Sequence, residues 1–178
     1  GQRAMFESRA GWLGMEAACA KLLSHAPLLD FYWTWRVMLR SLISVLGAPL
    51  PDARLYHAIS TGYAGLFGAR ARRATGRPLL LTEHGIYTNE RRVELCLADW
   101  LFHSGRDGFS IDDGIRELRD LWVALFASLA NLTYTHADEI ITLYRGNQLM
   151  QSADGAPTHK LRVIPNGVDY DRLSVIIR

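Results

Sequence analysis

Apolar residues recur at three- and four-residue steps in some parts of the chain and form short unbroken runs in others. The first pattern predicts helices and the second predicts buried strands. Helices are expected over 14–25, 31–50, 61–76, 89–103, 115–132 and 144–155. Strands are expected over 53–60, 79–82 and 138–143, and within 160–169 before a Pro-Asn-Gly turn.

Strands that alternate with helices predict a parallel sheet with right-handed crossovers. The expected strands are continuous apolar runs, which is typical of a sheet covered on both faces. The predicted fold class is therefore α/β, with a Rossmann-like doubly wound parallel sheet. In such sheets ligands bind beyond the carboxyl ends of the strands. Polar, glycine-containing turns follow all four strands, and they read "HAISTGYAG", "TEHGIYTNER", "TLYRGN" and "IPNGVD".

The helix expected over 31–50 allows two interpretations. Its aromatic residues and its arginines, Arg36 and Arg40, would suit a helix lying on a membrane surface. Its apolar fraction favours the other interpretation, a packed core helix whose arginines reach solvent. No run of about 18 uncharged apolar residues occurs, so no transmembrane helix is predicted.

Composition removes several classes of function. A net charge of +2 is too small for nucleic acid to be the main partner. The two cysteines, Cys19 and Cys96, lie in apolar stretches and are expected to be buried free thiols. No HExxH, HxH or CxxC spacing occurs, so no metal site is predicted. The GxSxG motif of serine hydrolases does not occur either, so this class of enzyme is not supported.

The stretch "LTEHGIYTNERR" carries the strongest candidate chemistry, because a buried strand ends there in Glu83, His84 and Gly85. Gly85 allows a sharp turn or the close approach of a ligand. The imidazole of His84 can donate or accept a hydrogen bond and can hold a proton near neutral pH. Glu83 is expected either to orient that imidazole or to contact sugar hydroxyls.

Arg91 and Arg92 are expected in the first turn of the following helix, where the helix dipole disfavours cations. An anion bound at the helix start would explain them. The alternative is that both are solvated or paired with Asp112, Asp113 or Glu94.

The turn "STGYAG" is a second glycine-bearing passage from a strand to a helix. Thr61 is expected to cap the helix, and the amides of Gly62 and Tyr63 could face an anion. The alternative is a plain capped helix start in which Gly65 allows close packing. The turn has neither the Walker pattern nor GxGxxG.

Four motifs occur together in one order: "YHAISTGYAG", "RPLLLTEHGIYTNERRVEL", "ADEIITLY" and "VIPNGVD". In this order and spacing the chain resembles the Pel exopolysaccharide glycosyltransferases (PelF), members of family 4 of the retaining glycosyltransferases with the GT-B fold. It departs from them mildly at Asn89, where "TNER" replaces the "TRER" expected after "GIY".

The resemblance implies a cytoplasmic enzyme that transfers glucose or a related hexose from a UDP-sugar to a saccharide. It implies no cofactor, because the UDP-sugar donor is a substrate. His84 would be the catalytic residue, and transfer would follow front-face attack without a carboxylate nucleophile. The implied substrate-binding residues are Glu83, Gly85, Tyr87, Arg91, Arg92, Thr61, Gly62, Tyr63, Asn166 and Gly167.

By the same resemblance, residues 1–165 would form the N-terminal, acceptor-side Rossmann-like domain without its first strand. Residues 166–178 would form a crossover toward a donor-binding domain. The chain alone is then expected not to transfer sugar. Its partners would include membrane-associated polysaccharide synthesis machinery at the inner membrane. The alternative is a non-catalytic Rossmann-like module that binds a sugar or a protein.

Overall fold

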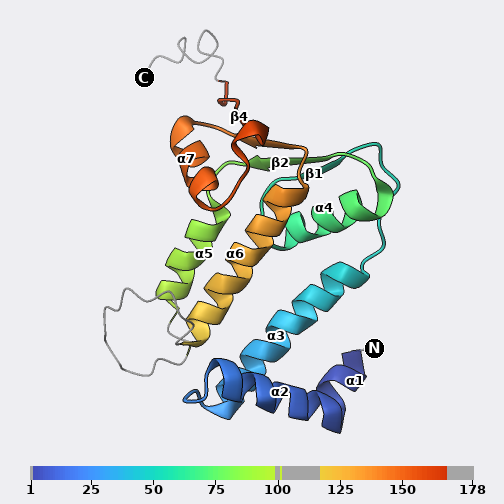
Figure 1. The fold of residues 1–178 in the computed structure, drawn as a ribbon, viewed down its shortest axis with the longest axis vertical. Helices are drawn as coiled ribbons and strands as arrows, with labels where there is room; N and C mark the ends of the chain where they lie inside the picture. Colours follow the sequence, from blue (N-terminus) through green and yellow to red (C-terminus); the bar gives the residue numbers. More distant parts are fainter. Residues whose placement is uncertain (1, 99–100, 102–116, 168–178) are drawn as a thin grey trace, which may run out of the picture.

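The computed structural model describes residues 2–98, 101 and 117–167, which form a mixed α/β structure (Figure 1). Its helices are α1 (Gln2–Glu7), α2 (Arg9–Leu22), α3 (Leu28–Gly47), α4 (Gly62–Thr75), α5 (Tyr87–Cys96), α6 (Leu118–His136) and α7 (Arg145–Ala153), with a 3-10 turn, η1 (Thr158–Lys160). Its strands are β1 (Tyr56–Ala58), β2 (Leu79–Glu83), β3 (Glu139–Thr142) and β4 (Leu161–Val163).

The four strands form one parallel sheet in the order β1-β2-β3-β4. The α/β class and the parallel, Rossmann-like sheet predicted from the sequence are therefore confirmed. The register pairs Leu81 with Ala58 on β1 and with Ile140 on β3. All carboxyl ends consequently lie along one edge of the sheet, and this edge receives the four predicted turns.

Helices cover one face of this sheet among the described residues. Leu79, Leu81 and Ile140 are buried, together with Ala130 and Tyr134 of α6. On the opposite face Leu80, Thr82 and Ile141 are half-buried, and His57 is exposed. Burial therefore alternates along the strands with a period of two. The expectation that both faces are covered is met on one face only in the part of the chain that the structure describes.

The end of the molecule remote from the sheet is helical (Figure 1). A second core there joins α2, α3, α5 and α6 around Met15, Phe31 and Phe126. The packed-core interpretation of α3 is only partly met, because Trp33 and Val37 are about half exposed. Arg36 lies over three aromatic rings nearby. Within the described residues no helix combines the length and hydropathy needed to span a bilayer.

Most element boundaries lie close to the predicted ones, but α1 was not predicted and α2 begins at Arg9, before the expected start at residue 14. Among the predicted helices, α5 differs most. It begins at Tyr87 and ends at Cys96, whereas 89–103 was expected. Val93 and Leu97, which their four-residue spacing places on one face of the expected helix, are both exposed; Trp100, on the same face, lies outside the described residues. Cys19 is a buried free thiol as expected, whereas the free thiol of Cys96 is exposed. Residues 168–178 also lie outside the described part, so the domain boundary at 165 stays a prediction.

Candidate functional site

The turns after β1 and β2 touch each other at the carboxyl edge of the sheet. Gly62 has φ +69°, a left-handed conformation that favours glycine. A Cβ atom at this position would lie 2.5 Å from the ring of Tyr87. The predicted site residues Thr61, Gly62 and Tyr87 are thus brought together from segments about 25 residues apart in sequence. Asn166 and Gly167 follow β4 at the same edge and are exposed.

His84 stands at this edge with its side chain exposed to solvent. Its backbone is held in place, because its carbonyl oxygen accepts a hydrogen bond from Asn147 Nδ2 of α7 at 3.0 Å. The Glu90 side chain folds back over Gly85, where an added Cβ atom would collide with it. The imidazole is therefore accessible to a ligand while the turn that carries it is fixed.

Glu83 faces the opposite way, into the protein, and its exposed fraction is 1%. The Tyr134 hydroxyl and Gln151 Nε2 each donate to its Oε2 at 2.9 Å. The Thr61 hydroxyl donates to its Oε1 at 3.3 Å, and the Tyr87 amide also donates to the carboxylate. The interpretation of Glu83 as a sugar-contacting group is wrong, because the protein itself encloses the carboxylate.

The expectation that Thr61 caps the following helix also needs correction. Thr61 makes no capping hydrogen bond to α4, since its hydroxyl binds Glu83 instead. The Tyr63 ring points into the helical core, where it packs edge-on against Phe126 at 5.9 Å between centroids. Only the backbone of Tyr63 remains available at the edge of the sheet.

The paired arginines lie in the second turn of α5, because the helix begins at Tyr87. The helix-dipole reason for an anion beside them therefore does not apply. Arg91 forms an ion pair with Glu94 and lies over the Tyr87 ring at 5.0 Å. Arg92 is exposed, and its guanidinium lies 3.5 Å from the Asn89 side-chain oxygen. Arg91 thus follows the pairing alternative, and Asp112 and Asp113 lie outside the described residues.

Comparison with known families matches residues 1–159 to the family described as "Domain of unknown function (DUF3492)". The chain belongs to this family. Neither the curated proteins nor the solved structures include a match to this chain. Within the described residues of this DUF3492 domain, no three His, Cys, Asp or Glu side chains are grouped so that they could hold a metal ion.

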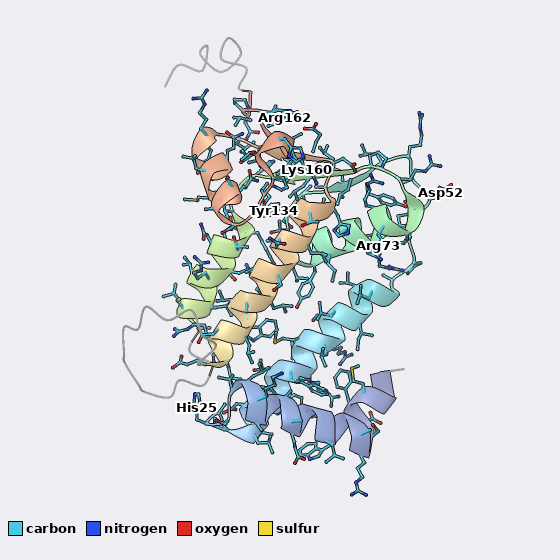
Figure 2. All side chains as sticks on the ribbon, viewed as in Figure 1. His25, Asp52, Arg73, Tyr134, Lys160 and Arg162 are labelled. Atoms are coloured by element: carbon cyan, nitrogen blue, oxygen red, sulfur yellow. The ribbon has the colours of Figure 1, made fainter. Side chains whose placement is uncertain are left out.

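The DUF3492 site also contains residues that sequence reasoning missed. Tyr134, Asn147 and Gln151 hold Glu83 and His84 from α6 and α7. Figure 2 shows Tyr134 near the end of α6 that meets the sheet. Asn147 and Gln151 are four residues apart on one short helix, and both are buried. The four-residue spacing of these two side-chain amides, which places them on one helix face, was the sequence signal that could have identified them.

Burial governs the ionisation of Glu83. It raises the pKa of the carboxyl group, and the hydrogen bonds from Gln151, Tyr134 and Thr61 only partly oppose it. Burial, together with the nearby carboxylate of Glu83, also raises the pKa of Tyr134, so the phenol keeps its proton and remains a donor.

The raised pKa makes the stability of the domain depend on pH. The folded state holds the Glu83 proton at pH values where the unfolded chain, with a pKa of about 4.3 to 4.5, has released it. The contribution of Glu83 to stability is therefore fully present below pH ~4.3 and is lost as the pH rises through the raised folded pKa.

Glu83→Gln cannot titrate at this position. We therefore expect the difference in unfolding free energy, variant minus wild type, to increase as the pH rises through this window. The slope should be at most about 1.4 kcal/mol per pH unit. Urea denaturation of both proteins at several pH values from 4 to 8 measures the difference, using about 0.5-unit steps. Parallel stability curves would contradict the raised pKa.

Proposed function

We propose that this chain forms the acceptor-side half of a retaining glycosyltransferase, which transfers a hexose such as glucose from a UDP-sugar during exopolysaccharide synthesis. The single observation that carries the proposal is the placement of His84. Its imidazole is exposed at the carboxyl edge of a parallel sheet, on a backbone held by Asn147. Ligands of open parallel sheets bind at this edge.

Two further features support the proposal. The run of motifs from "YHAISTGYAG" to "VIPNGVD" resembles the Pel glycosyltransferases. The first turn of α4 lacks a side-chain cap, since Thr61 binds Glu83, so its amides can bind an anionic oxygen of a sugar nucleotide. Gly62 and Tyr63 supply the first of these amides, and Gly62 lies against the turn that follows His84.

In the proposed reaction His84 hydrogen-bonds the donor sugar or supports the positive charge that develops at its anomeric carbon. The bond between the anomeric carbon and the phosphate oxygen breaks, and the acceptor hydroxyl attacks from the same face. The leaving phosphate accepts the acceptor proton. Because no protein nucleophile takes part, catalysis depends on positioning and on fixed dipoles. The acceptor would be a saccharide held by polysaccharide synthesis machinery at the inner membrane.

Titration of the 178-residue chain with UDP-glucose, followed by amide chemical shifts, tests the location of the site. We expect shifts in the amides of residues 61–63, 84–88, 164, 166 and 167, and we expect His84→Ala to reduce them. The amide of Leu79, at the opposite end of β2, serves as an internal control because Asp138 holds it at 2.8 Å. The absence of shifts at the carboxyl edge, or equal shifts at both edges, would contradict the proposed site.

A non-catalytic module that binds a sugar or a protein is the alternative. Such a module could bind UDP-glucose at the same edge, so binding alone does not separate the two. Transfer of labelled glucose by the full-length polypeptide does, because it requires a catalytic group as well as a binding surface.

A further inference from the structure

Glu83 gathers hydrogen bonds from four separate parts of the chain. The donors are Thr61 after β1, Tyr87 at the start of α5, Tyr134 on α6 and Gln151 on α7. A carboxylate has two oxygens that can accept about four hydrogen bonds, whereas a carboxamide offers one accepting oxygen. An acidic side chain can therefore accept hydrogen bonds from all four segments at once, which a carboxamide cannot do.

The use of a carboxylate at this position has a cost. None of its four donors carries a charge, and burial disfavours the ionised form. The preceding residues of β2 are Leu79, Leu80, Leu81 and Thr82, so an apolar side chain would fit the same strand. A buried acidic group without a cationic partner contributes little net stability. We therefore look for the effect of Glu83 in how it arranges the chain segments that are hydrogen-bonded to it.

The segment that it fixes is the turn that carries His84. Tyr87 closes this turn by donating its amide to Glu83, while the Tyr87 ring packs against Gly62. The amides of Asn89 and Glu90 then bond to the Ile86 carbonyl at 3.0 and 3.1 Å and begin α5. The carboxylate thus ties the start of α5 to the end of β2.

We infer that Glu83 is a positioning residue of the candidate site: it locks the His84 turn onto the β1–α4 turn, α6 and α7, so that the exposed imidazole is presented in one orientation. This inference rests on the proposed function for the role of His84, but the lock itself can be measured without any activity.

Hydrogen exchange of the 178-residue chain tests the lock. In Glu83→Gln, the amides of Tyr87, Asn89 and Glu90 should exchange about tenfold faster, as expected for the loss of one buried hydrogen bond. The Leu79 amide at the other end of β2 should not change. Thr142→Val is the matched control, because Thr142 pairs with Glu83 in register, is fully buried, and its hydroxyl has no hydrogen-bond partner in the part of the chain that the structure describes.

A second control separates local loosening from general instability. Leu161→Ala removes a buried side chain from β4 and destabilises the same core. The two variants are compared at temperatures equally far below their own melting temperatures. Under these conditions Leu161→Ala should not selectively accelerate amide exchange in residues 87–90. In the full-length transferase, Glu83→Gln should lower kcat more than it raises KM for the donor, and Leu161→Ala should change neither.

Unchanged exchange at 87–90 in Glu83→Gln would overturn the positioning role, whatever the activity. Faster exchange together with a lower kcat would support it. Faster exchange in an enzyme that is unaffected by His84→Ala would instead overturn the proposed function and, with it, the catalytic importance of the lock.

Discussion

If the proposed function is right, His84→Ala lowers the rate of sugar transfer by about 100-fold to 1000-fold, the usual cost of removing one preorganised catalytic donor. Its melting temperature should change little. The imidazole is exposed, and the contact that fixes this turn uses the backbone carbonyl of residue 84, which alanine retains. Initial rates with labelled UDP-glucose, together with thermal unfolding of both proteins, measure the two effects.

His159→Ala provides the matched control. His159 is also exposed, but it lies in η1, before β4 and at the opposite edge of the sheet. Its loss should leave both turnover and melting temperature unchanged. His84→Gln retains a hydrogen-bond donor, so partial recovery of turnover would identify hydrogen bonding to the sugar as the main role. Equal losses of turnover and stability in His84→Ala would make His84 a structural residue and contradict the proposal.

The fold was predictable from the sequence where the local signals agreed. Gly62 and Gly76 enclose α4, and the predicted helix over 61–76 differs from α4 by one residue at each end. The start of α5 was expected at residue 89, whereas the chain returns to helix at Tyr87, two residues after Gly85. The buried face of a helix also depends on which neighbours reach it, and the sequence does not contain this information for Val93 and Leu97.

The candidate site was predictable in its location but not in its construction. Strand periodicity places Leu79, Leu81 and Glu83 on one face, so the burial of Glu83 follows once that face is known to carry the helices. The same reasoning turns His84 away from the core. The partners of Glu83 could not be predicted, because Tyr134 and Gln151 lie 51 and 68 residues further along the chain. Only the folded arrangement of α6 and α7 brings them together.

The second large effect is expected at Gly65, where α4 crosses α6. A Cβ atom at this position would overlap the Thr133 hydroxyl and lie 2.8 Å from its methyl carbon. Thr133 is fully buried, and its hydroxyl donates to the Leu129 carbonyl at 2.7 Å, so the side chain cannot rotate away without losing that bond. Gly65→Ala should therefore destabilise the domain by about 1 to 3 kcal/mol, even though alanine is the better helix former.

Gly14→Ala isolates the helix-propensity effect, because Gly14 is also inside a helix but has open space around it. That change should stabilise the domain by about 0.5 to 1 kcal/mol. Thr133→Ala should recover part of the loss in a Gly65→Ala background, with a favourable coupling of about 0.5 to 3 kcal/mol between the two sites. Urea denaturation of the four variants that form the cycle measures this coupling. If the effects of the two substitutions on unfolding free energy are additive, positions 65 and 133 are not coupled and the proposed collision is contradicted.

The consequence of Gly65→Ala should extend to the candidate site. Gly65 lies in the first turns of α4, just after Thr61 and Gly62, and Thr133 precedes Tyr134 on α6. Forcing the helices apart would displace two of the donors to Glu83 at once, Thr61 from one side and Tyr134 from the other. We therefore expect amide exchange at 87–90 to accelerate in Gly65→Ala and to slow again in the double variant. Recovery of stability without recovery of exchange would show that the turn is held independently of the α4–α6 crossing.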